Sequence, residues 1–219
     1  MTDAPSSTPT ESDLGGTPES LDSVAVFCGS SPGNDPVHSY LANAVGEYIA
    51  AHGKRLVYGG GGLGLMGVVA SAARDGGARV LGVIPEVLRE VEASLDGIEH
   101  YFVPDMHTRK IRMYAESDAF IILPGGIGTL EEAVEVLSWQ RLNLHNKPIL
   151  FLSDTGYWDH LLAEFDRIME QGFASKDMAN DILVATTVEE AFGILEDRIA
   201  NPVERKPLGL RDVSVETLG

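Results

Sequence analysis

The chain has few basic residues, one cysteine and no long apolar run. Its 16 Lys and Arg are outnumbered by 33 Asp and Glu, giving a formal net charge of −17 over 219 residues. This charge argues against a nucleic-acid partner, because phosphate backbones require a basic surface. The single cysteine, Cys28, excludes an internal disulfide and leaves the redox compartment open. No apolar stretch approaches the roughly 20 residues that span a bilayer, and the N-terminus lacks the features of a secretory signal. A soluble cytoplasmic protein without a membrane partner is expected.

Two common chemistries also lack their signatures. The six histidines show no His-Glu-x-x-His spacing, and one cysteine cannot build a thiolate site, so no metal is expected. His107 and His145 are interpreted as hydrogen-bonding residues. The G-x-x-x-x-G-K-[ST] loop of P-loop NTPases is absent.

The composition divides the chain into one domain and two tails. Residues 1–22 are rich in Ser, Thr, Pro, Asp and Glu and contain no Lys or Arg, which predicts a disordered acidic tail. Residues 202–219 are interrupted by proline and are expected to be only partly ordered. Residues 23–201 are long enough, and apolar enough, to form one domain with a sizeable core.

Short apolar strands alternate with helical segments between the tails. Strands are expected at 24–28, 55–58, 79–84, 101–103, 119–123, 148–152 and 182–185. Helices are expected at 38–52, 65–74, 107–117, 157–171 and 188–200, and helical spacing also follows residue 129, at Leu130, Val134 and Leu137. Continuous apolar strands between amphipathic helices predict an α/β fold, with a parallel sheet covered on both faces.

Three glycine-rich segments follow predicted strands, at 28–31, 59–62 and 125–129. Ligands of such sheets bind beyond the carboxyl ends of the strands, so the three loops are expected to converge on one crevice. The last of them opens a helix. Its glycines would let backbone N–H groups approach a phosphate, whose charge the helix end favours. Glu131 and Glu132, one turn further on, make this anion site a candidate active site.

Two glycine patterns resemble other motifs without fitting them. Residues 29–33 satisfy G-x-S-x-G, but a nucleophile elbow needs a helix immediately after the serine, and Pro32 to Pro36 delay it. Residues 62–67 satisfy G-x-G-x-x-G, with Glu86 at about the distance of a ribose-binding acid. A single such fingerprint is weak, and glycines that permit close helix–strand packing explain it at least as well.

Thr129 and Glu132 allow two interpretations. Thr-x-x-Glu at a helix start is a capping box, in which Thr129 caps the helix and Glu132 reaches back to it. The glycines that precede this pair favour a catalytic role for Glu132 instead. Arg109 and Lys110 stand at the start of another predicted helix, where the dipole disfavours cations. They indicate an anionic ligand or a facing carboxylate, and Arg109 is the better candidate because its planar fork suits phosphate.

With these residues in view, the chain resembles the LOG ("Lonely guy") family of cytokinin riboside 5′-monophosphate phosphoribohydrolases between about residues 24 and 200. The resemblance rests on motifs in the family order. These are Cys28-Gly29-Ser30-Ser31, Tyr58-Gly59-Gly60-Gly61, Gly64-Leu65-Met66-Gly67, Gly82-Val83-Ile84-Pro85, Met106-His107-x-Arg109-Lys110, Pro124-Gly125-Gly126-x-Gly128-Thr129-x-x-Glu132, His145-x-Lys147-Pro148 and Gly156-Tyr157.

The resemblance implies a Rossmann-like, doubly wound parallel sheet, a homodimer and no cofactor. It implies hydrolysis of the N-glycosidic bond of a nucleoside 5′-monophosphate to a free base and ribose 5-phosphate, with AMP among the substrates. Arg109 and Glu132 would be catalytic. The implied substrate-binding residues are Ser30, Gly60, Gly61, Glu92, Met106, Lys110, Gly125, Gly126, Ile127, Gly128, Thr129, Leu130, Glu131 and Ser138.

Two other functions stay open. A nucleotide- or cofactor-binding carrier could share the glycine loop, but it would not need Arg109 paired with Glu132. Lysine decarboxylase, a label attached to relatives of this family, requires a Schiff-base lysine. Lys110 and Lys147 are the only lysines in the matched motifs, and neither has a recognisable cofactor context. The chain also departs from the family after Trp139, where it has Gln140-Arg141-Leu142-Asn143 in place of A-Q-L-G.

Overall fold

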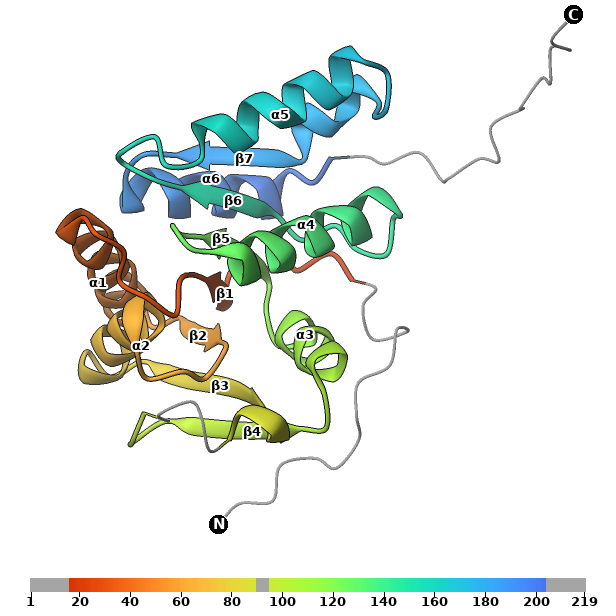
Figure 1. Ribbon diagram of the computed structural model, residues 1–219. Helices are drawn as coiled ribbons and strands as arrows, with labels where there is room; N and C mark the ends of the chain where they lie inside the picture. The colour runs from red at the N-terminus through yellow and green to blue at the C-terminus, as the bar shows by residue number, and fades with distance from the viewer. Residues whose placement is uncertain (1–15, 90–94, 204–219) are drawn as a thin grey trace, which may run out of the picture.

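A computed structural model describes residues 16–89 and 95–203. Within these ranges, seven parallel strands form one sheet in the order β4-β3-β2-β1-β5-β6-β7 (Figure 1). Their bounds are β1 Ser23–Phe27, β2 Arg55–Tyr58, β3 Arg79–Pro85, β4 Glu99–Val103, β5 Ala119–Ile122, β6 Ile149–Leu152 and β7 Ile182–Ala185.

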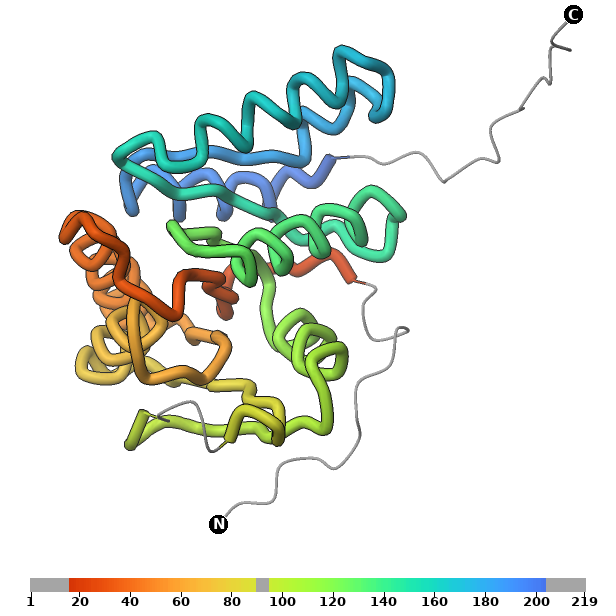
Figure 2. The backbone as a smooth tube through the Cα atoms, in the orientation of Figure 1, coloured from red at the N-terminus to blue at the C-terminus, as the bar shows by residue number. Residues whose placement is uncertain are grey.

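In the part of the chain that the structure describes, six α-helices cover the two faces of the sheet (Figure 2). The helices α1 Pro36–Ala51, α2 Gly64–Asp75 and α6 Val188–Ala200 pack on one face. The helices α3 Met106–Ala115, α4 Ile127–Arg141 and α5 Asp159–Glu170 pack on the other. The described residues also form two short 3₁₀ helices, η2 Glu86–Leu88 and η3 Lys176–Asn180, which were not predicted from the sequence. The α/β, doubly wound parallel sheet is confirmed.

The continuous apolar strands are explained by burial on both sides. In β1, Val24 and Val26 belong to the core under α1, α2 and α6, whereas Ala25 and Phe27 belong to the core under α3, α4 and α5. Because successive side chains of a strand point to opposite faces, a sheet between two helical layers needs apolar residues at every position.

The order of the strands reverses at β1, which pairs with β2 on one side and β5 on the other. Hydrogen bonds connect the loops that follow these three strands. Gly29 N donates to Pro124 O at 3.1 Å, and Leu65 N donates to Gly29 O at 3.0 Å. Gly64 has φ +59°, and a Cβ atom at Gly64 would lie 2.3 Å from the carbonyl carbon of Ser30. The three glycine loops therefore converge on one crevice, as predicted.

The folded part begins slightly before the predicted domain. Leu21 is buried, and its carbonyl oxygen accepts a hydrogen bond from Lys54 Nζ at 2.9 Å. The backbone N–H groups of Asp22 and Ser23 donate to the Asp118 carboxylate. Most of the predicted acidic tail, residues 1–15, and nearly all of the C-terminal tail, from residue 204, lie outside the described residues. No helix of the described ranges is long and apolar enough to cross a membrane.

Candidate active site

The beginning of α4 is an open helix N-terminus. Gly126 is the N-cap residue, and no side chain caps it. Thr129 is therefore the third residue of the helix and not its cap, so the capping-box alternative is wrong. A Cβ atom at Gly126 or Gly128 would have no neighbour within 4 Å. The first turn of α4 thus borders open space and has no side-chain cap, and the positive end of the helix dipole makes this space suitable for an anion.

The loop that leads into α4 is fixed by its neighbours. A Cβ atom at Gly125 would lie 2.1 Å from the hydroxyl oxygen of Thr129, a buried residue, so only glycine fits there. The hydroxyl of Tyr157 donates to the carbonyl oxygen of Gly125 at 2.6 Å. The anion site is therefore formed before any ligand arrives.

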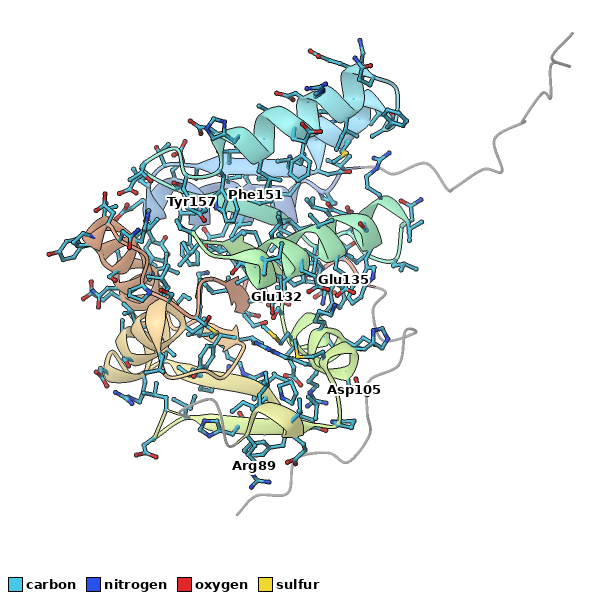
Figure 3. All side chains as sticks on the ribbon, viewed as in Figure 1. Arg89, Asp105, Glu132, Glu135, Phe151 and Tyr157 are labelled. Carbon is cyan, nitrogen blue, oxygen red and sulfur yellow. The ribbon has the colours of Figure 1, made fainter. Side chains whose placement is uncertain are left out.

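Arg109 of α3 and Glu132 of α4 face each other in the crevice. The Nη2 atom of Arg109 lies 3.8 Å from Oε1 of Glu132, and the two side chains are 7% and 12% exposed. This distance makes an ion pair but is too long for a hydrogen bond. Burial raises the pKa of Glu132 to about 7, although the positive charge of Arg109 opposes the shift. Glu132, labelled in Figure 3, can accordingly accept or release a proton near neutral pH.

Arg109 has hydrogen-bonding capacity left. Its Nε atom is buried without a hydrogen-bond partner among the described residues, and Nη1 reaches only the sulfur of Met106, at 3.8 Å. Asp105 caps α3 by accepting from Thr108 N at 2.7 Å. The N-terminus of α3 is thus capped by the Asp105 carboxylate. Arg109, one turn further along α3, lies beside Glu132.

Lys110 connects α3 to α4. Its Nζ atom lies 2.5 Å from Glu131 and 2.9 Å from Glu135. Partial burial lowers the pKa of Lys110, but the hydrogen bonds to these two carboxylates outweigh it and the pKa rises above its ordinary value. Glu135 was missed by the sequence analysis. The signal for it was its position four residues after Glu131, on the same face of the helix.

A cavity of about 350 Å³, called here the first hollow, contains most of the predicted site. Nine predicted residues line it: Ser30, Met106, Arg109, Gly126, Ile127, Gly128, Thr129, Glu131 and Glu132. Cys28 and Met66 also line it and were given no role in advance. Burial, followed by the nearby charge of Glu132, raises the pKa of the Cys28 thiol, which is therefore neutral. The roles of these residues in binding or catalysis stay predictions.

Other predicted residues lie elsewhere. Gly60 has φ +86°, and a Cβ atom there would lie 2.2 Å from the Ile84 side chain, so it serves a tight turn. Ser138 is on the exposed face of α4, where its hydroxyl donates to Val134 O at 2.7 Å. Glu92 lies outside the described residues. The remaining predicted residues that do not line the first hollow are Gly61, Lys110, Gly125 and Leu130.

A second cavity, of about 470 Å³, adjoins the first and is called here the second hollow. It is lined by Gly29, Ser30, Ser31, Pro32, Gly33, Asn34, Asp35, His38, Leu65, Pro124, Gly125, Gly126 and Tyr157. Within residues 16–89 and 95–203, no group of three or more His, Cys, Asp and Glu could hold a metal ion.

The two glycine patterns that resembled other motifs have packing explanations. A Cβ atom at Gly67 would lie 2.2 Å from Gly62 O, so this glycine allows the chain to pack closely at the start of α2. Glu86 pairs with Arg89 at 3.4 Å, and its side chain is half exposed. The helix after Ser31 begins only at Pro36, so the strand–turn–helix geometry of a nucleophile elbow is absent from this loop.

Comparison with known proteins gives the family. A family model described as "possible lysine decarboxylase" matches residues 66–195. The probable cytokinin riboside 5′-monophosphate phosphoribohydrolase LOGL1 of Oryza sativa subsp. japonica is 43% identical over 185 residues, which cover 84% of this chain and 83% of that protein. The cytokinin riboside 5′-monophosphate phosphoribohydrolase LOG1 of Arabidopsis thaliana is 41% identical over 198 residues, covering 90% and 92%. The chain belongs to the LOG family. Among solved structures, the molybdenum cofactor binding protein of Rippkaea orientalis superposes with a TM-score of 0.63 at 20% identity, covering 82% of this chain and 98% of that one, a likeness of fold alone.

Arg141 and Lys147 lie away from the first hollow in this LOG-family chain. Arg141, in the segment that departs from the family pattern, pairs with the buried Asp181 at 3.2 Å and so ties the end of α4 to the start of β7. Lys147 lies ahead of β6, at the end of the strands opposite the first hollow. Its Nζ atom donates to Tyr114 O at 2.7 Å, and burial lowers its pKa to about 8. Lys147 is thus a buried structural lysine, remote from the crevice.

Proposed function

We propose that this protein hydrolyses the N-glycosidic bond of nucleoside 5′-monophosphates, releasing a free base and ribose 5-phosphate. Cytokinin riboside 5′-monophosphates and AMP are the proposed substrates. The observation that carries the proposal is the buried Arg109–Glu132 pair beside an uncapped helix N-terminus. The names of the relatives support the same reaction class.

The 5′-phosphate binds at the start of α4 in this proposal. The N–H groups of Ile127, Gly128 and Thr129 and the helix dipole supply the positive potential. Lys110 is already matched by two carboxylates, which leaves the phosphate to the amides and to Arg109. Binding a phosphate far from the reacting carbon holds the sugar in place and converts binding energy into rate.

Glu132 handles the proton in the reaction. As the bond between C1′ and the base nitrogen breaks, its electron pair leaves with the base and positive charge develops on the sugar. The ionised carboxylate stabilises that charge and takes a proton from the water whose oxygen bonds to C1′. The proton then passes to the departing base. A pKa of about 7 suits a group that must both accept and return a proton near neutral pH.

Arg109 stabilises negative charge in the proposed reaction. Its free Nε atom and its position next to Glu132 allow it to bind a phosphate oxygen or a nitrogen of the departing base. Its charge also keeps part of the Glu132 population ionised, because it opposes the effect of burial on the pKa of Glu132.

A homodimer is proposed through the outer face of α4. Ile127 and Val134, 83% and 40% exposed, lie along one side of the helix, and Leu142, its C-cap residue, is 54% exposed. Met106 of α3, 42% exposed, adds to this surface next to the first hollow. An exposed apolar stripe of this kind is typical of an interface, and a second copy of the chain presents the matching stripe.

The test is incubation of purified protein with AMP and with isopentenyladenosine 5′-monophosphate, following free base and ribose 5-phosphate by mass spectrometry. Release of both products, reduced about a thousandfold in Glu132→Gln, is expected. The ratio of the two rates gives the preferred base. Undiminished release in Glu132→Gln would remove this residue from the mechanism. Binding without any release would favour a carrier.

A further inference from the structure

Met106 is the most exposed methionine of the described residues. Met66 and Met113 are buried, Met169 and Met178 are partly buried, and Met106 is 42% exposed. Met106 also lines the first hollow, which has to stay open for a ligand in a monomer and in a dimer. A small reagent in solution therefore reaches the sulfur of Met106 more easily than the sulfur of the other four.

The thioether of Met106 accepts a hydrogen bond from Arg109. Nη1 of Arg109 donates to Sδ at 3.8 Å, and Nε has no partner among the described residues. A second thioether lies close by, since a Cβ atom at Gly59 would lie 1.9 Å from Nη2 of Arg109 and 3.2 Å from Sδ of Met66. Sulfur is a weak acceptor. The guanidinium group thus keeps most of its hydrogen-bonding capacity for a ligand.

Oxidation would change the strength of the Met106 acceptor. Hydrogen peroxide transfers one oxygen atom to a thioether: the O–O bond breaks, an S–O bond forms, the sulfur loses two electrons and the peroxide is reduced to water. The product is a polar sulfoxide, whose oxygen accepts hydrogen bonds. A hydrogen bond from a guanidinium to such an oxygen is charge-assisted and stronger than one to a thioether. Because Sδ of Met106 already lies beside Nη1 of Arg109, the new oxygen can bind Nη1 or the unpartnered Nε.

We propose that Met106 is a modification site for peroxides, and that its sulfoxide binds Arg109 and so removes this arginine from the ligand of the first hollow. The effect on AMP rests on the proposed function, whereas the oxidation and the new hydrogen bond do not. Cys28 does not compete for the oxidant, because its thiol is buried and neutral and the thiolate is the reactive form. Reduction of the sulfoxide by methionine sulfoxide reductases returns Arg109 to the ligand.

The first experiment locates the oxidation and its contact. Wild-type protein is treated with dilute hydrogen peroxide, and its peptides are analysed by mass spectrometry. Oxygen is expected on Met106 before it appears on Met66 or Cys28. The Nε–H signal of Arg109 in a nitrogen–proton correlation spectrum, assigned by its absence in Arg109→Lys, is expected to shift on oxidation of wild type but not of Met106→Leu. Earlier oxidation of another residue, or an unmoved Arg109 signal, would overturn the inference.

The second experiment measures AMP binding by calorimetry on protein carrying Glu132→Gln, so that no turnover is required. Peroxide is expected to weaken AMP binding roughly tenfold, the loss of one charge-assisted hydrogen bond, and methionine sulfoxide reductase to restore it. With Met106→Leu added, treated and untreated protein should bind AMP equally. Met66→Leu is the matched control and should stay sensitive to peroxide.

The outcomes separate this inference from the hydrolysis. Peroxide sensitivity that persists in Met106→Leu would overturn the inference. Loss of AMP binding that depends on Met106, in a protein whose wild type releases no base, would support the modification site and refute the hydrolysis. Absence of AMP binding in untreated protein would refute the proposed function, and the Arg109 signal would still decide whether the sulfoxide of Met106 binds Arg109.

Discussion

The guanidinium group of Arg109 fills the space that a side chain at position 59 would need. A Cβ atom built on Gly59 lies 1.9 Å from Nη2 and 3.1 Å from Cζ of Arg109. The glycine after β2 thus sets how deeply the arginine enters the crevice, and with it the position of its charge relative to Glu132.

Gly59→Ala is expected to lower kcat/KM for AMP about a hundredfold, because a displacement of the order of 1 Å in a catalytic group has an effect of this size. The measurement is steady-state kinetics together with a circular dichroism spectrum. Gly193→Ala is the matched control, since a Cβ atom at this helical glycine meets nothing within 4 Å. Wild-type kinetics in Gly59→Ala would mean that the exact place of Arg109 is unimportant.

The fold and the position of the crevice could be predicted from the sequence. Apolar strands between amphipathic helices require a covered parallel sheet, and its carboxyl edge necessarily collects the loops at Gly29, Gly62 and Gly125. Contacts between helices could not be predicted from the sequence in this way. The pairing of Lys110 with Glu135 depends on how α3 docks against α4, which no local pattern encodes.

The raised pKa of Glu132 and the contact between Tyr157 and Gly125 could not be predicted from the sequence either. The raised pKa of Glu132 comes from burial in the assembled crevice, so spacing alone left a capping role open for this residue. Tyr157 reaches Gly125 across 32 positions of sequence, and only the pairing of β5 with β6 brings them together.

The charges around Glu132 should tune the pH profile in opposite directions. Lys110 lowers the pKa of Glu132 and Glu135 raises it. Lys110→Met is therefore expected to move the acid limb of kcat/KM to higher pH, and Glu135→Gln to lower pH, each by about half a unit. The measurement is kcat/KM for AMP between pH 5 and 9. Shifts of the same sign in both variants would show that they act through loss of the α3–α4 contact and not through charge.

The exposed stripe of α4 should control assembly. Val134→Glu places a charge in the proposed interface and is expected to convert a dimer to a monomer, because an unpaired charge buried between subunits costs several kcal/mol. Light scattering coupled to size exclusion measures the mass. Val184→Glu, on the edge strand β7 with similar exposure of the native valine, is the control and should leave the mass unchanged. A wild-type protein that is monomeric at all concentrations would remove this interface.

Glu132 should also make stability depend on pH. Its folded-state pKa, about 7, lies above the ordinary value of 4.5, so the folded protein binds the proton more tightly than the unfolded chain does. Stability is then highest at or below pH 4.5, falls as pH rises from 4.5 to 7, and is constant above that range as far as this residue is concerned. The difference of pKa corresponds to about 3 kcal/mol in the free energy of unfolding.

Glu132→Gln replaces the carboxyl group with a neutral one that does not titrate. Relative to wild type, the variant is expected to gain stability progressively between pH 5 and pH 8, by roughly 2–3 kcal/mol over that interval. Urea unfolding at several pH values measures this gain, with the exposed Glu164→Gln on α5 as control. A difference between variant and wild type that stays constant with pH would mean that Glu132 is not held in a desolvated site. A gain that follows pH as described would mean that this carboxylate is kept at the expense of stability, as expected for a group retained for its chemistry.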